Sequence, residues 1–75
     1  MKVHYDDAVD ALYIELSEET PDGAIELSDG INVDTTAEGR IAGIEILNAS
    51  SRMDLTTILS YSLDVDKSVS ALNAQ

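Results

Sequence analysis

Apolar and polar residues alternate over several segments of the 75-residue chain, and this two-residue period is typical of strands with one buried face. The pattern begins with Val3 and Tyr5 and resumes with Leu12, Ile14 and Leu16 after an acidic stretch. If Tyr5 faces Leu12 and Val3 faces Ile14, the apolar side chains of both segments lie on one side, as antiparallel pairing requires. The beginning of the chain therefore predicts a β-hairpin.

The dipeptide Asp29-Gly30 is typical of a two-residue turn between paired strands. In the simplest hairpin register around it, however, each apolar residue would lie opposite a polar one on both faces. One long strand over residues 24–34, with Asp29-Gly30 as a bend or bulge inside it, keeps the apolar residues at one parity. We therefore predict the long strand, whose apolar positions are Ile25, Leu27, Ile31 and Val33.

A turn is predicted at residues 36–39, and the most apolar run of the chain follows it. A four-residue loop there pairs Val33 with Ala42 and keeps one face apolar. Ile41 and Leu47 then lie on the other face. This arrangement fits a central strand, or a strand whose second face contacts a partner.

The apolar period changes from two residues to helical spacing after Ser51. Leu55 and Ile58 would lie on one stripe, and Ser51 with Asp54 three residues later resembles a capping box. We predict a helix over residues 52–62 whose stripe packs on the core face of the sheet.

The predicted fold class is α+β, an antiparallel β-meander of about four strands with one C-terminal helix packed on one face. A chain of this length buries one small core, so we expect a single domain over residues 1–63. Residues 64–75 carry a weaker pattern and are predicted to be a tail that is either flexible or binds a partner.

Fifteen acidic residues against four basic ones give the chain a net charge of −11 at neutral pH. Four basic residues cannot neutralise many phosphates, so nucleic-acid binding by this chain alone is not expected. Without cysteine there is neither a disulfide nor a cysteine zinc site, and no window has the apolar length of a signal peptide or a membrane span. We expect a cytoplasmic protein that does not bind membranes.

Three motifs occur in order along the chain: Tyr5-Asp6-(x)3-Asp10-Ala11-Leu12-Tyr13-Ile14, Leu27-Ser28-Asp29-Gly30-Ile31-Asn32-Val33-Asp34, and Glu38-Gly39-Arg40-Ile41-(x)-Gly43-Ile44-Glu45-Ile46-Leu47-Asn48-Ala49. With these motifs the chain resembles domain of unknown function family 2283, a family of small prokaryotic proteins. The resemblance covers residues 1 to about 50 and implies a small cytoplasmic β-meander without an established catalytic activity. Some relatives resemble antitoxin partners of small ribonuclease-like toxins. No catalytic residue is implied.

One segment matches the spacing of an EF-hand calcium loop, with Asp34, Thr36, Glu38, Gly39, Ile41 and Glu45 at template positions. An EF-hand needs a helix on each side, whereas strands are predicted here. Gly39 is better explained as the left-handed residue of a hairpin turn. The calcium site is therefore the less favoured interpretation.

A second acidic cluster contains Asp6, Asp7 and Asp10, which could bind magnesium or another hard cation through their oxygens. Such a segment is more often a solvated turn in which aspartates accept hydrogen bonds from their own backbone. We predict no metal site, and weak divalent-cation binding stays an alternative with Asp6, Asp7, Asp10, Asp34 and Glu38 as its candidate ligands.

His4 is the only histidine, and no Gly-x-Ser-x-Gly segment accompanies it. The four glycines are isolated, so no phosphate-binding loop is indicated. A small sheet with one helix also offers little concavity for a substrate. We therefore expect neither an enzymatic activity nor a cofactor.

Strand alternation gathers acidic side chains and a few apolar ones on the face opposite the core, where negative potential would suit a basic protein. The chain is thus predicted to be a non-enzymatic protein-interaction module. In the more specific form of this prediction, the chain is an antitoxin-like protein that binds a basic ribonuclease-like toxin. The alternative is a homodimer that buries Tyr13, Ile41 and Leu47. The predicted protein-binding residues are Tyr13, Glu15, Glu26, Asn32, Ile41, Glu45 and Leu47.

Overall fold

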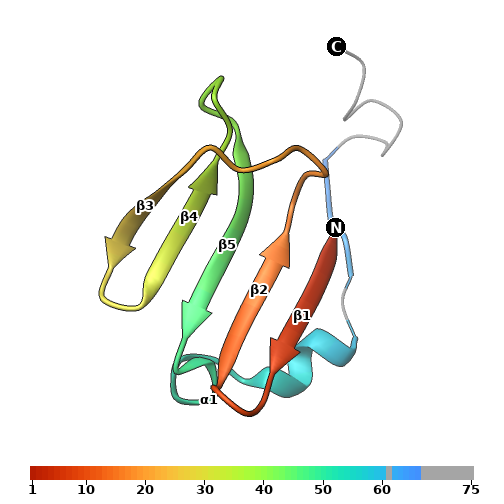
Figure 1. Cartoon of the computed structure of the whole chain (residues 1–75). Helices are drawn as coiled ribbons and strands as arrows, with labels where there is room; N and C mark the ends of the chain where they lie inside the picture. Colours follow the sequence, from red (N-terminus) through yellow and green to blue (C-terminus); the bar gives the residue numbers. More distant parts are fainter. Residues whose placement is uncertain (61, 67–75) are drawn as a thin grey trace.

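The computed structural model describes residues 1–60 and 62–66, in which five strands form one antiparallel sheet (Figure 1). The strands are β1 (Lys2–Asp6), β2 (Ala11–Glu15), β3 (Gly23–Ser28), β4 (Ile31–Thr35) and β5 (Ile41–Leu47). They lie in the order β1-β2-β5-β4-β3. A short helix, α1 (Ala49–Arg52), and a 3-10 turn, η1 (Leu55–Leu59), follow them. Most of the tail predicted for residues 64–75 lies outside the described residues.

The strand order corrects the predicted four-strand meander, because β2 lies beside β5 rather than beside β3. The connection from β2 to β3 passes the ends of β5 and β4, where Leu16 and Ser17 both donate their N–H groups to the Ala42 carbonyl. The Asp22 N–H then donates to the Thr35 carbonyl at 2.7 Å. β5 is consequently the central strand, as its predominantly apolar sequence suggested.

The first hairpin has the predicted register, with Val3 opposite Ile14 and Tyr5 opposite Leu12. Leu12 has no exposed surface, because strands lie on both sides of it and it faces the small core. The alternation of apolar residues was sufficient here, since no bulge interrupts either strand.

The long strand predicted for residues 24–34 is wrong, because the chain turns at Asp29-Gly30 and β3 pairs with β4. A β-bulge between Glu26 and Ser28 adds one residue to β3 and shifts the register. Ile25 therefore lies opposite Val33, and both faces stay consistent, which the simple hairpin register did not allow. Gly30 has a φ of 80°, the left-handed conformation that the turn needs.

The turn at residues 36–39 is confirmed by the hydrogen bond from the Gly39 N–H to the Thr36 carbonyl at 3.0 Å. The predicted pairing of Val33 with Ala42 is off by two residues, because Val33 lies opposite Ile44. A bulge between Asp34 and Thr35, which lies opposite Ile41, accounts for one of these two residues. A shift of two residues leaves every side chain on its predicted face up to that bulge.

The helix predicted for residues 52–62 is replaced by the two short elements α1 and η1. Met53 is extended, with φ −153° and ψ 161°, and so ends α1. The Asp54 carboxylate accepts a hydrogen bond from the Thr56 N–H at 3.1 Å and caps η1. Ser51 donates its hydroxyl to the Asn48 carbonyl instead of capping a longer helix. The fold is accordingly mostly β with little helix.

The strand registers assign the side chains to two faces of the sheet. The apolar face carries Val3, Tyr5, Leu12, Ile14, Ile25, Ile31, Val33, Ile44 and Ile46. The acidic face carries Tyr13, Glu15, Glu26, Asn32, Asp34 and Glu45, and the registers place Lys2, His4 and Leu47 on it as well. The buried apolar residues are Leu12, Val33, Ala42 and Ala49.

Candidate functional site

The acidic face is built from two rows of directly paired residues that cross the whole sheet. One row reads, from β1 to β3, His4, Tyr13, Glu45, Asn32 and Glu26. The Asn32 Nδ2 donates to the Glu45 Oε1 at 3.3 Å within this row. The predicted binding residues from four different strands are thus direct neighbours, because cross-strand partners share a face.

The second row reads, from β1 to β3, Lys2, Glu15, Gly43, Asp34 and Ala24. The Tyr13 hydroxyl crosses from the first row to donate to the Asp34 Oδ2 at 2.9 Å. Burial, the bond to Asp34 and the charges of the surrounding carboxylates raise the pKa of Tyr13. Tyr13 therefore stays protonated and tethers β2 to β4 across the central strand.

Gly43 is the residue of this site that the sequence analysis missed. Its backbone lies directly under the Tyr13 hydroxyl, where a Cβ atom would overlap the ring. An isolated glycine inside a strand often marks such a close approach, so the signal was present in the apolar run around it. Gly43 lets the tyrosine lie flat across β5 and reach Asp34.

Ile41 and Leu47, which were predicted to join the binding face, lie at opposite ends of β5. Leu47 pairs with Ala11, two residues before Tyr13, and so lies on the acidic face as predicted. Ile41 lies beyond the β-bulge near Thr35, where strict alternation ends. Both side chains are exposed. The structure therefore separates Ile41 from Tyr13 and Leu47, and the homodimer that would bury these three residues stays a prediction.

The acidic cluster at the β1–β2 turn is organised by Asp10, which has a φ of 54°. Its Oδ1 accepts hydrogen bonds from the Tyr5 hydroxyl at 2.7 Å and the Ser50 N–H at 3.0 Å, and its Oδ2 accepts one from the Ser50 hydroxyl at 2.7 Å. These bonds, that from Tyr5 above all, lower the pKa of Asp10. Asp6 accepts from the Ala8 N–H, as predicted for a turn. Asp10 thus fastens α1 to the first hairpin.

The residues with EF-hand spacing do not surround a common point. Asp34 lies opposite Gly43 and Glu45 opposite Asn32 within the sheet, and the exposed Glu38 lies in the turn between β4 and β5. In residues 1–60 and 62–66, no group of three or more His, Cys, Asp and Glu side chains could hold a metal ion. Gly39 has the predicted left-handed conformation, with a φ of 80°.

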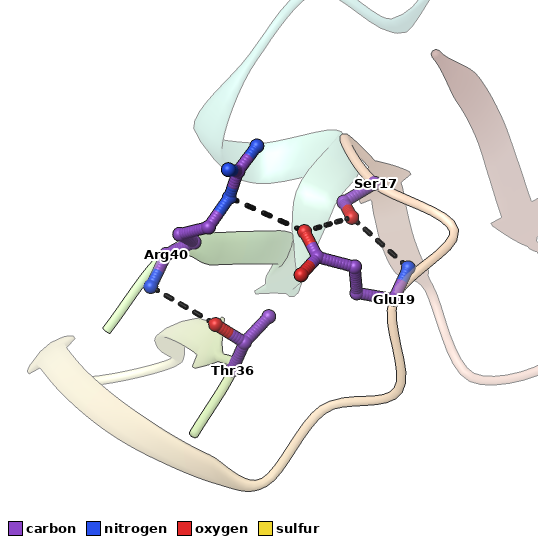
Figure 2. Close-up of polar contacts among 4 residues, drawn as sticks. All are labelled: Ser17, Glu19, Thr36 and Arg40. Carbon is purple, nitrogen blue, oxygen red and sulfur yellow. Dashed lines mark hydrogen bonds and ion pairs between the residues drawn. The ribbon is translucent and has the colours of Figure 1, made fainter. Parts of the chain in front are cut away.

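A third polar cluster joins the loop after β2 to the turn after β4 (Figure 2). The Glu19 Oε2 lies 3.3 Å from the Arg40 Nε and accepts a hydrogen bond from the Ser17 hydroxyl at 3.0 Å. The Arg40 N–H donates to the hydroxyl of Thr36, which is buried. Because Arg40 holds the carboxylate beside Ser17, this cluster is a loop anchor rather than a nucleophile with a free base.

Two hollows flank β1. One, of about 440 Å³, is lined by Met1, Lys2, Glu15, Leu16, Ser17 and Glu18. The other, of about 390 Å³, is lined by Met1, Val3, Thr57 and Ile58. Lys2 and Glu15, at the β1 end of the second row, line the first hollow, whereas Glu26, Asn32 and Asp34 line neither.

Comparison with known proteins assigns the chain to a family. No helix among the described residues is long and apolar enough to cross a membrane. No curated protein and no solved structure matches the chain. A family model does match residues 2–50, a span that contains all five strands of the sheet. The chain therefore belongs to the family described as Protein of unknown function (DUF2283).

Proposed function

We propose that the protein is a non-enzymatic protein-interaction module that binds a basic protein through its acidic face. The observation that carries this proposal is the concentration of unpaired carboxylates in two adjacent rows. Within residues 1–60 and 62–66 the one ion pair joins Arg40 to Glu19, which are in loops outside those rows. The carboxylates at Glu15, Glu26 and Glu45 thus have no cation within ion-pair distance in that part of the chain.

The scaffold under these carboxylates suits rapid recognition of a positively charged surface. The face spans β2, β5, β4 and β3, whose hydrogen-bonded registers hold the side chains in place without a loop. A field of one sign over such a surface steers an oppositely charged partner and raises its association rate. Tyr13 and Asn32 add a ring and an amide in the centre, where interface hot spots concentrate.

The open position of the acidic face supports the non-enzymatic part of the proposal. Catalytic carboxylates usually lie in a concave site that excludes water and perturbs their pKa values. Here the carboxylates with a lowered pKa are Asp10 and Asp54, and each is held by hydrogen bonds that anchor a turn or cap η1. The chemistry of the face is therefore that of charge recognition.

A ribonuclease-like toxin is the specific partner class that this chemistry would fit. Such a toxin binds RNA phosphates in a basic groove, and the rows of carboxylates would occupy the same groove in place of phosphates. The protein would then act as an antitoxin by competing with the substrate. This form of the proposal rests on charge complementarity and on the resemblance of some relatives to antitoxin partners.

The test is co-purification of proteins with the tagged chain from its native host, at low and at high salt. The variant Glu15→Lys, Glu26→Lys, Glu45→Lys should lose the partners that the unmodified chain retains at low salt. The matched control, Glu18→Lys, Asp22→Lys, Glu38→Lys, makes the same charge change in exposed loops and should keep them. Equal losses from both variants, or retention that does not depend on salt, would contradict a specific acidic binding face.

A further inference from the structure

Among residues 1–60 and 62–66, the apolar face of the sheet is covered only in part, since Leu12 and Val33 are the two of its nine side chains that are buried. Ile25 is 55% exposed and Val3 is 38% exposed, although both lie on the same face as the buried Leu12 and Val33. A stable domain normally buries such a face against a second layer of helices or strands. A single sheet with one open apolar face is therefore an incomplete core.

The second layer that the described residues provide lies only over the half of the sheet formed by β1 and β2. Figure 1 shows α1 and η1 at the β1 and β2 side, with no described segment over β3 and β4. Ala49 is fastened to the Asp10 carbonyl at the first turn, and Ile58 lines a hollow together with Val3. Every residue of β3 is exposed. The exposure is thus greatest at the β3 edge, whereas Val33 of β4 is buried.

The composition of the apolar face identifies a second copy of the chain as the occupant. None of its nine positions holds Asp, Glu, Lys or Arg, although the chain has a net charge of −11. Two such faces can meet without burying a charge, and a two-fold axis makes them complementary in size and twist. A basic partner, by contrast, would gain nothing electrostatically from this face.

The repulsion between two acidic chains is small in this arrangement. Sheets packed face to face are about 10 Å apart, and the acidic faces point outward from that pair. The carboxylates of the two acidic faces are then separated by more than the Debye length of roughly 8 Å at physiological ionic strength. The absence of charge from the nine positions of the apolar face is what makes self-association compatible with the net charge.

The size of the apolar face is close to what a specific dimer needs. Five strands spaced about 4.8 Å apart, with about six residues each rising about 3.3 Å, give a face of roughly 24 by 20 Å. Two such faces would bury at most roughly 1,000 Å² as flat projections, which is about the lower limit for a specific interface. The part that α1 and η1 cover lowers this area, and side-chain relief raises it.

We propose that two copies of the chain pack through their apolar faces into a β-sandwich, with both acidic faces outward. This interface is distinct from the acidic binding face and from a dimer that buries Tyr13, Ile41 and Leu47. The dimer would present two identical acidic faces on opposite sides. It would complete the core of each copy, so folding and dimerisation would be coupled.

The test is sedimentation velocity of the full chain at several micromolar concentrations, with two matched double variants. The unmodified chain should sediment as a dimer of twice its 8.0 kDa mass. Val3→Lys, Ile25→Lys places lysines at both sides of the apolar face, at positions exposed in one copy, and should halve the sedimenting mass. His4→Lys, Glu26→Lys changes the next residue in each strand, which lies on the opposite face, and should remain a dimer.

A second measurement needs no variant. The Tm of the unmodified chain should rise with protein concentration, because a dimer is stabilised by mass action. A monomer with a concentration-independent Tm would overturn the proposal, as would equal loss of dimer in both double variants. These outcomes are separate from the co-purification result, since Val3→Lys, Ile25→Lys leaves the acidic face unchanged.

Discussion

Replacing Gly43 with alanine is expected to displace the Tyr13 ring and so destabilise the fold. The new Cβ would overlap the end of the ring and would lie 3.0 Å from the Ile14 carbonyl oxygen. The ring can move only by giving up its 2.9 Å hydrogen bond to Asp34. Gly43→Ala therefore removes one tether across the sheet and leaves a tight backbone contact.

The magnitude follows from these contacts. A hydrogen bond to a charged group contributes roughly 1.5 to 3 kcal/mol, and the lower end applies to this half-buried pair. Alanine regains roughly 0.5 to 1 kcal/mol over glycine inside a strand, while the tight contact with Ile14 costs part of that gain. The expected net loss is about 0.5 to 1.5 kcal/mol, or a fall of roughly 2 to 12 °C in Tm for a small domain.

The assay is urea and thermal unfolding followed by circular dichroism, at one protein concentration for all variants. Gly23→Ala is the control, because a Cβ there meets only the Thr35 hydroxyl at an ordinary 3.8 Å, and it should be neutral or slightly stabilising. In a Tyr13→Ala background most of the cost of Gly43→Ala should disappear. If the cost is the same in both backgrounds, the tyrosine is not its cause and the reasoning is refuted.

Three further predictions concern the turns. Tyr5→Phe should raise the pKa of Asp10, which NMR can measure, because it removes the hydrogen bond from the Tyr5 hydroxyl. The stability that this bond contributes is present above the ordinary pKa of 3.8 and is lost as pH falls through the lowered value. The unfolding free energies of the two proteins should therefore converge in strong acid. Gly39→Ala should cost about 1 kcal/mol in urea unfolding from backbone strain alone, since φ is 80° and the space is open; a neutral result would contradict this. Glu19→Gln should change the unfolding free energy by less than about 1 kcal/mol, because its pair with Arg40 is 42% and 73% exposed; a larger loss would show a buried role.

The alternation of residues predicted the first hairpin and the two faces of the sheet, because side-chain direction in a strand depends only on parity. The alternation did not predict the turn at Asp29-Gly30, because the one-residue bulge between Glu26 and Ser28 changes which residues of the two strands lie opposite each other. Bulges leave little trace in an apolar pattern, since they change the count of residues by one without changing their types. The predicted helix failed for a related reason, as the Asp54 cap favours a separate short turn that the spacing of Leu55 and Ile58 does not reveal.

The arrangement of the candidate site, too, could be predicted only in part from the sequence. Parity placed Tyr13, Glu15, Glu26, Asn32 and Glu45 on one face correctly. Their arrangement in two rows depends on which strands are neighbours, and the β2 and β5 pairing joins segments that are far apart in sequence. Gly43 became interpretable only when that pairing put the Tyr13 ring above it.

The sequence by itself determined that the chain forms a β-rich domain whose strands carry charged side chains on one face and apolar side chains on the other. Local periodicity suffices for this, because every residue in a strand points to one of two sides. Only the tertiary structure decided the strand order, the contact between Tyr13 and Asp34, and how much of the apolar face α1 and η1 cover. These depend on long-range pairing and on where a second layer ends, which no local pattern specifies.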